Sequence, residues 1–225
     1  MLQHLGIIMD GNRRWAKENG VSTLDGHKTG ANNAKNIAYL AQDKGIKYLT
    51  LWALSNDNLK KRNPLEVQGI IQLINNIRDV LGALLHENVR FETIGDIEKL
   101  PEKSQKVLAS IKEETKHNTN LVLTLALVYG GQDEIIRATK KILAENKNPE
   151  DLSREEFRSY LDTHFLPHPD LIIRTGGDIR HSGFLLFDSE YAEYYFTEKK
   201  WPEFDEQELQ KALDFYNHSK RNFGK

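Results

Sequence analysis

Apolar runs and amphipathic segments alternate along the whole chain. Runs of mainly aliphatic and aromatic residues predict buried strands, and they lie at 5–9, 46–54, 89–94, 121–129, 171–173 and 184–187. Segments with the helical spacing of apolar positions lie at 29–44, 65–86, 101–117, 133–146, 155–164 and 205–217, and another helix begins near Trp15. This alternation predicts an α/β fold: a single domain over residues 1–225, with a largely parallel central sheet flanked by helices on both faces.

Two segments between the second and third strands have unusual patterns. Residues 55–63 are rich in charged and amide side chains and lack periodicity, which predicts a loop at the end of a strand. Pro64 then begins a helix, at the position where its missing N–H costs least. The apolar positions of helix 65–86 cover a wider arc than a surface helix needs, so this helix and strand 121–127 either line an apolar tunnel or belong to the core.

Composition narrows the class of protein. Hydrophobic residues make up 39% of the 225, charged residues 28%, and the formal net charge is −2, which suits a globular protein and gives no electrostatic reason to expect nucleic acid. The chain has no cysteine, which excludes disulfides and thiolate metal sites and is compatible with the cytoplasm. No apolar run has the length of a membrane span and no cleavable signal pattern is present, so we expect any membrane contact to be peripheral.

The first predicted strand ends in residues suited to a phosphate and a divalent cation. Asp10 follows the strand, at the edge where open α/β sheets keep their ligands, and its carboxylate can hold Mg²⁺. Gly11 allows a tight turn and a close approach of the backbone to a ligand. Arg13 and Arg14 are natural partners of phosphate, although a solvated turn with incidental arginines would show the same residues.

Two further strand ends carry similar groups. Residues 55–58 (Ser-Asn-Asp-Asn) follow the second strand, and residues 174–182, which begin with Arg174 and end with Ser182, follow the strand at 171–173. Because parallel strands end at the same edge of a sheet, we expect all three loops to open together. Two separate arginine sets and two carboxylates, Asp10 and Glu193, then suit two phosphorylated substrates and one divalent metal.

Several blocks, in order along nearly the whole chain, resemble the cis-prenyltransferase family. The blocks are Met9-Asp-Gly-Asn-Arg-Arg-Trp-Ala-Lys, Gly26-His-Lys-x-Gly30, Ser55–Asn58, Tyr129-Gly-Gly, Asp170-Leu-Ile-Ile-Arg-Thr-Gly-Gly-Asp, Ser182-Gly-Phe-Leu-Leu, Tyr191-Ala-Glu, Trp201-Pro-x-Phe and Arg221-Asn-Phe-Gly. The aspartate-rich DDxxD motif of the all-helical trans-prenyltransferases is absent from the sequence.

The resemblance implies a Z-type polyprenyl diphosphate synthase, which condenses isopentenyl diphosphate with an allylic diphosphate and makes a lipid-carrier precursor such as undecaprenyl diphosphate. Asp10 and Asn58 would be catalytic, and Asp10 and Glu193 would hold Mg²⁺. The allylic diphosphate would be bound by Gly11, Asn12, Arg13, Arg14, Trp15, His27, Ser55, Asn56, Asp57 and Lys61 or Arg62. Isopentenyl diphosphate would be bound by Arg174, Arg180, His181 and Ser182. The family also implies a cytoplasmic homodimer, whose segment 221–224 reaches the neighbouring site, and peripheral membrane contact through the product.

Departures from the family pattern leave the preferred starter and the product length open. Thr23 stands where many bacterial members have an arginine, Leu59 replaces a loop tryptophan, and Ile179 replaces an occasional histidine. Preferred starter and product length therefore stay open, including a short-chain or branched product. Two other functions compete: a non-catalytic partner subunit, which would lack Asp10, and an aspartate-dependent phosphotransferase, which would need an aspartate in place of Asn12.

Overall fold

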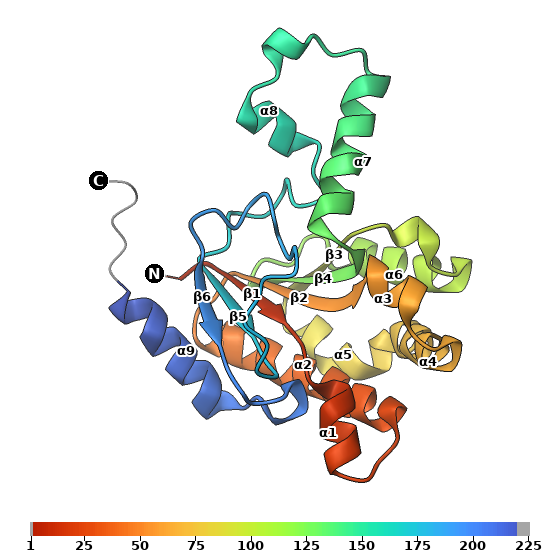
Figure 1. Ribbon diagram of the computed structural model, residues 1–225, viewed down its shortest axis with the longest axis vertical. Coiled ribbons are helices and arrows are strands. Elements are labelled where there is room, and N and C mark those ends of the chain that lie inside the picture. The colour runs from red at the N-terminus through yellow and green to blue at the C-terminus, as the bar shows by residue number, and fades with distance from the viewer. Residues whose placement is uncertain (1, 220–225) are drawn as a thin grey trace.

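The computed structural model, which describes residues 2–219, has an α/β fold with a parallel sheet at its centre (Figure 1). The described residues form a six-stranded sheet in the order β3-β4-β2-β1-β5-β6, in which every neighbouring pair is parallel. The strands are β1 (His4–Ile8), β2 (Tyr48–Ser55), β3 (Val89–Ile94), β4 (Leu121–Tyr129), β5 (Leu171–Arg174) and β6 (Glu193–Phe196). The predicted fold class is confirmed.

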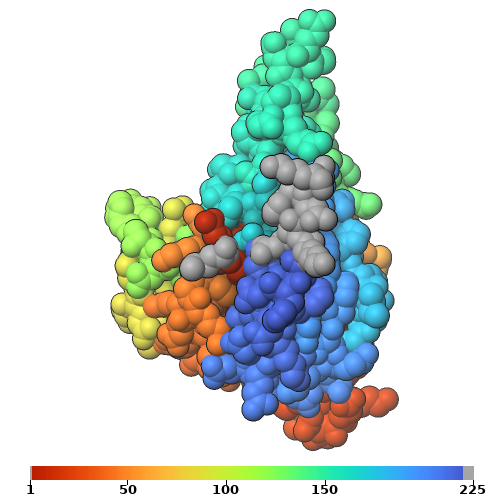
Figure 2. Space-filling model, turned by 90° about the vertical axis from the view of Figure 1, so that its left-hand side faces the viewer, coloured from red at the N-terminus to blue at the C-terminus, as the bar shows by residue number. Residues whose placement is uncertain are grey.

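Helices connect the strands and bury the larger core against the sheet. They are α1 (Asn12–Glu18), α2 (Thr23–Asp43), α3 (Asn56–Lys61), α4 (Pro64–Asn75), α5 (Ile77–His86), α6 (Glu102–Thr115), α7 (Gly131–Ala144), α8 (Arg154–Ser159) and α9 (Glu206–His218). Short 3₁₀ turns lie at Ile97–Lys99, Pro149–Asp151 and Trp201–Glu203. The larger core joins β-strand side chains such as Leu5 and Leu49 to Ile37 of α2, Leu81 of α5 and Leu209 of α9. Helices α7 and α8 project from the sheet as an arm, which is also visible from the side (Figures 1 and 2).

Several helices begin or end at residues other than those predicted, because capping side chains set their boundaries. The side chain of Ser22 accepts a hydrogen bond from the Asp25 N–H, so α2 begins at Thr23 rather than at 29 and includes His27. Ser55 caps α3 in the same way, through the Asn58 N–H, and the predicted loop 55–63 is therefore partly helical. The Ser153 side chain caps α8 through the Glu156 N–H, and this helix ends at Ser159 rather than at 164.

Two other predictions about secondary structure are wrong. The expected single helix 65–86 is divided into α4 and α5 at Asn76, whose backbone (φ −101°, ψ 16°) leaves the helical region. Residues 184–187 form turns rather than a strand, because Ser182 and Leu185 have φ values of 51° and 47°, which are incompatible with an extended backbone. The sixth strand is instead Glu193–Phe196, within the aromatic segment.

Candidate active site

The carboxyl ends of β1, β2 and β5 form one edge, as expected from a parallel sheet. Strand β1 lies between β2 and β5, and its last residue, Ile8, pairs with both Trp52 and Arg174. Asp10 follows two residues after Ile8, so its carboxylate lies beside the end of β5. The three loops that sequence motifs single out therefore meet at this edge.

Asp10 is held between two arginines. Its Oδ2 accepts a hydrogen bond from Arg174 Nη2 at 3.0 Å, and its Oδ1 lies 3.2 Å from Arg14 Nη2. Burial by itself would raise the pKa of Asp10, but the hydrogen bond from Arg174 and the charge of Arg14 outweigh it, so the pKa is lowered. Asp10 is therefore a fixed negative charge at the sheet edge.

Asp178 is a second carboxylate in the same cluster. Its Oδ2 lies 3.0 Å from Arg180 Nη2 and 3.5 Å from both Arg14 Nη2 and Arg174 Nη2. In the sequence, Asp178 is only one residue of a motif, and nothing there shows that it contacts three arginines. Arg14 and Arg174, which were predicted to belong to different arginine sets, both contact Asp10 and Asp178.

The loop after β5 wraps around the Arg174 guanidinium. Arg174 Nη1 donates hydrogen bonds to the carbonyl oxygen of Arg180 (2.6 Å) and to Ser182 Oγ (2.7 Å), and the side chain is only 6% exposed. Gly176 brings the loop over Asp10: its φ is +88°, and a Cβ there would lie 2.8 Å from Arg14 Nη2. Arg174 Nε has no hydrogen-bond partner within the described chain, so one buried donor remains for an anion.

A second cluster of charged side chains lies around Glu66 of α4. Glu66 Oε1 is 3.0 Å from His27 Nε2 and accepts a hydrogen bond from Arg62 Nη1 at 2.9 Å, and its Oε2 is 4.0 Å from Arg13 Nε. Burial lowers the pKa of His27, and the hydrogen bond to Glu66 only partly opposes this. Glu66 could not be predicted as a site residue, because it lies in a helix 39 residues from His27 and belongs to no recognised phosphate motif.

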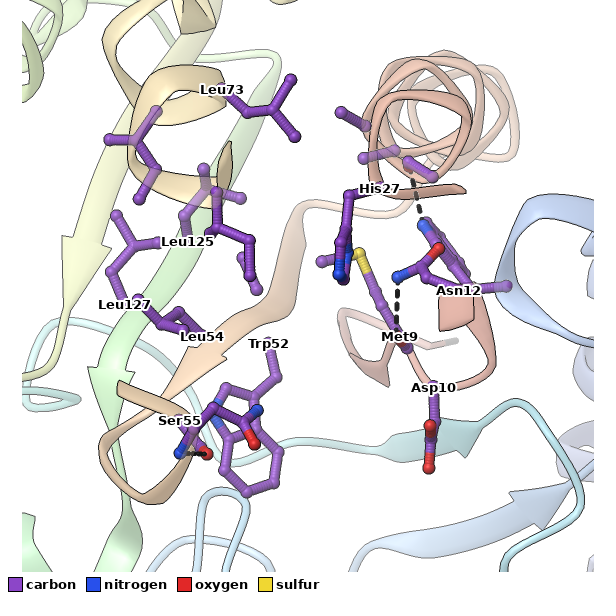
Figure 3. Close-up of a pocket in the computed structure, with 18 of the residues that line it drawn as sticks. Met9, Asp10, Asn12, His27, Trp52, Leu54, Ser55, Leu73, Leu125 and Leu127 are labelled. Carbon is purple, nitrogen blue, oxygen red and sulfur yellow. Dashed lines mark hydrogen bonds between the residues drawn. The ribbon is translucent and has the colours of Figure 1, made fainter. Parts of the chain in front are cut away.

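Both clusters adjoin one elongated cavity of about 330 Å³. Its polar part includes Asp10, Asn12, His27, Ser55, Asn58, Arg62, Arg174 and Ser182. Its apolar part includes Leu54, Ile70, Leu73, Ile74, Ile77, Val80, Leu81, Leu125 and Leu127. In Figure 3, Leu54, Leu125 and Leu127 lie on the side opposite Met9, Asn12 and His27. The wide apolar arc of α4 and α5 thus faces a cavity as well as the core.

Several residues expected at the site have other contacts. The Lys61 ammonium pairs with Asp57 at 2.7 Å and both are exposed, so Arg62 rather than Lys61 faces the cavity. The ring Nδ1 of His181 accepts a hydrogen bond from the Gly183 N–H within its own loop. Asn56 is buried and Trp15 is half-buried, and neither is among the residues that line this cavity.

Glu193 does not lie beside Asp10 in this chain. It begins β6 and pairs with Leu171, which in turn pairs with Leu5 of β1. Leu5 lies three residues before the end of β1 at Ile8, and Asp10 follows that end, so about 10 Å of sheet at about 3.3 Å per residue separates the level of Glu193 from the edge that carries Asp10. Asp10 and Glu193, which were predicted to hold the same Mg²⁺, therefore do not meet within this chain, because Glu193 starts a strand and does not follow one.

Asp10 by itself fits a magnesium site that a substrate would complete. Within residues 2–219, no cluster of three or more His, Asp or Glu side chains could hold a metal. Mg²⁺ is commonly bound by one or two carboxylates together with phosphate oxygens and water. Asp10, one third exposed at the polar end of the cavity, meets that requirement.

The chain is similar to known prenyltransferases over its full length. It is 42% identical to an isoprenyl transferase from Staphylococcus saprophyticus (99% of this chain and 89% of the relative). It is 40% identical to the ditrans,polycis-undecaprenyl-diphosphate synthase, (2E,6E)-farnesyl-diphosphate specific, from Micrococcus luteus (99% and 91%).

Solved structures show the same fold. Lavandulyl diphosphate synthase from Lavandula x intermedia, crystallised with dimethylallyl diphosphate, matches with a TM-score of 0.96 and 36% identity over 100% of this chain and 98% of that one. A probable undecaprenyl diphosphate synthase from Campylobacter jejuni matches with a TM-score of 0.83 and 31% identity (100% and 99%). Residues 8–224 match the prenyltransferase family model described as putative undecaprenyl diphosphate synthase, and the chain belongs to this family of prenyl-transferring enzymes.

Proposed function

We propose that this chain condenses isopentenyl diphosphate with an allylic diphosphate and forms a new Z double bond. The observation that supports this best is the buried Arg174 guanidinium at the polar end of a cavity whose other end is apolar. The positively charged end of the cavity suits a diphosphate, and the apolar end suits a prenyl chain. The family of the chain supports the same reaction.

The two clusters suggest how the diphosphates are divided. The allylic diphosphate lies over Gly11–Arg14 and contacts His27 and Arg62. Isopentenyl diphosphate lies at Arg174, Arg180 and Ser182. Arg14 borders both, because it contacts the same two carboxylates as Arg174. Asp10 would hold Mg²⁺ together with diphosphate oxygens, and the ion would neutralise charge on the departing group.

The reaction breaks the allylic C1–O bond and forms a carbon–carbon bond to isopentenyl diphosphate. Arg14, Arg62 and His27 stabilise the negative charge that develops on the leaving diphosphate. The isopentenyl C4 forms the new bond to the allylic C1, positive charge develops on C3, and a proton then leaves C2, so that the new double bond forms between C2 and C3. Asn58, at the cavity wall, is an amide and not a base, so we propose that it relays this proton to diphosphate or water.

The product is proposed to be a polyprenyl lipid-carrier precursor such as undecaprenyl diphosphate. A short or branched product is the second candidate, because a lavandulyl diphosphate synthase matches this chain with a TM-score of 0.96. No helix within residues 2–219 has the length and apolar character needed to cross a membrane. We further propose a cytoplasmic homodimer that meets membranes only peripherally, through its product. The tail segment 221–224, expected to reach a neighbouring site, lies outside the described residues.

Product analysis tests the proposal. The protein is incubated with labelled isopentenyl diphosphate, Mg²⁺ and allylic starters of several lengths, and the extracted products are sized and their double bonds assigned. Long Z-polyprenyl products support the lipid-carrier function, and a single ten-carbon product supports the second candidate. Absence of any prenyl product longer than its starter, labelled or not, from folded protein with every starter, would refute prenyl transfer.

A further inference from the structure

The proposed function places the allylic diphosphate beside His27, Arg62 and Arg13. In the structure, the Glu66 carboxylate contacts these same side chains. Its Oε1 is shared by His27 Nε2 (3.0 Å) and Arg62 Nη1 (2.9 Å), and Arg13 Nε is 4.0 Å from Oε2. The Glu66 and His27 side chains are 10% and 11% exposed, so little water competes for these contacts. A buried guanidinium needs an anionic partner, and Glu66 supplies one to Arg62.

The charges of this cluster do not balance. One carboxylate faces two guanidinium groups, of which Arg13 is 64% exposed and at the limit of ion-pair distance. His27 adds no full charge near neutral pH, because burial lowers its pKa. A diphosphate, which carries more negative charge than one carboxylate, is therefore a better partner for these groups than Glu66.

We propose that Glu66 is a resident counter-anion, which holds Arg62 and His27 in place until the allylic diphosphate exchanges a phosphate oxygen for the Glu66 carboxylate. This proposal rests on the proposed function, since it assigns a role within the same site. It makes Glu66 a positioning residue that lowers affinity for the allylic substrate and eases release of the diphosphate.

The exchange also involves the segment that carries Asn58. Arg62 directly follows α3, and its backbone N–H donates to the carbonyl oxygen of Asn58 at 3.1 Å. A shift of the Arg62 backbone as its side chain leaves Glu66 for a phosphate would act on Asn58 through this hydrogen bond. Arrival of the allylic diphosphate is thereby coupled to the position of Asn58.

The backbone near Glu66 is fixed independently of its carboxylate. Asn63 Oδ1 accepts a hydrogen bond from the Leu65 N–H, and Pro64 occupies the first helical turn of α4. Glu66→Gln keeps the shape of the side chain and removes its charge, so we expect a folded variant. Asp25→Asn is a matched control, because it removes one exposed negative charge two residues from His27 without touching Arg62.

Calorimetry with farnesyl diphosphate, inorganic pyrophosphate and isopentenyl diphosphate tests the exchange. Glu66→Gln should bind the first two about five- to tenfold more tightly than the wild type and isopentenyl diphosphate within twofold, whereas Asp25→Asn should change none of the three by more than twofold. Weaker or unchanged binding of farnesyl diphosphate and pyrophosphate in Glu66→Gln would overturn the proposal. Equal tightening in Asp25→Asn would also overturn it, because a long-range charge effect would then suffice.

Histidine NMR of the wild type tests the same exchange without a variant. Replacement of Glu66 by pyrophosphate should raise the pKa of His27, because more negative charge then faces the ring. The other groups that face His27 are Arg62 and Arg13, and their charge does not change. An unchanged His27 pKa at saturating pyrophosphate would refute the exchange. Product formation by the wild type is measured separately. If the wild type formed no prenyl product but Glu66→Gln bound pyrophosphate more tightly, the proposed function would be rejected and the role of Glu66 would stand.

Discussion

Replacement of Arg174 by lysine should damage isopentenyl diphosphate binding although the positive charge is kept. Arg174 makes three directed hydrogen bonds, to Asp10 Oδ2, to the Arg180 carbonyl and to Ser182 Oγ. A lysine ammonium is a single point charge and cannot hold the loop and a phosphate at once. Loss of one to two charge-assisted contacts corresponds to about 2 to 3 kcal/mol, or about 30- to 160-fold in affinity.

The measurement is the Kd of isopentenyl diphosphate by calorimetry for Arg174→Lys, with thermal unfolding to confirm the fold. Arg154→Lys is the control, because Arg154 begins α8 on the arm and pairs with the exposed Glu190, so that this variant should keep the Kd within twofold of the wild type. If folded Arg174→Lys bound isopentenyl diphosphate within threefold of the wild type, the assignment of Arg174 to this substrate would be wrong.

Three further predictions concern the metal, the cavity and pH. Asp10→Asn should lower kcat about 100- to 1,000-fold in saturating Mg²⁺ without unfolding the protein, and activity that survives in this variant or in excess chelator would contradict the metal site. Leu81→Ala, at the apolar wall, should lower the free energy of unfolding by about 2 to 4 kcal/mol and lengthen the products, and unchanged product lengths would contradict a role of this wall. Burial raises the pKa of Glu134 from 4.5 to about 7; because the unfolded chain releases this proton first, the free energy of unfolding should fall as pH rises from 4.5 to 7. Glu134→Gln should remove that slope in thermal unfolding, and parallel pH profiles of variant and wild type would refute it.

The strands at the centre of the sheet were predictable because burial on both faces gives unbroken apolar runs. Strands β3 and β4 have the predicted boundaries, and β5 differs by one residue. The wrong predictions of secondary structure lie where a single side chain or backbone angle determines whether a helix begins, continues or ends. Ser55 converts part of a polar loop to helix through a single cap, and Asn76 divides a helix that remains apolar on both sides of it. Local periodicity averages over such positions and does not detect them.

The polar edge was predictable for a different reason: each motif directly follows a strand, and parallel strands end together. Asp10 and Arg174 meet although 164 residues separate them, because β1 and β5 are neighbours in the sheet. The same reasoning was not valid for Glu193, because it is the first residue of its strand and therefore lies at the opposite edge of the sheet. Strand order and direction, rather than residue type, therefore explain why Asp10 lies at the site and Glu193 does not.

The carboxylates that pair with the site arginines could not be predicted from the sequence, and they change what a diphosphate must displace when it binds. Glu66 and Asp178 are ordinary helix and loop acids in the sequence, yet each contacts two or more of the cations that a diphosphate would use. If these cations bind diphosphates as proposed, binding is an exchange of one anion for another, and its free energy is a difference between the two sets of contacts. Because Arg14 shares both Asp10 and Asp178 with Arg174, its charge would then act on both substrates, and the group around Glu66 would be the part of the described site that discriminates the allylic diphosphate.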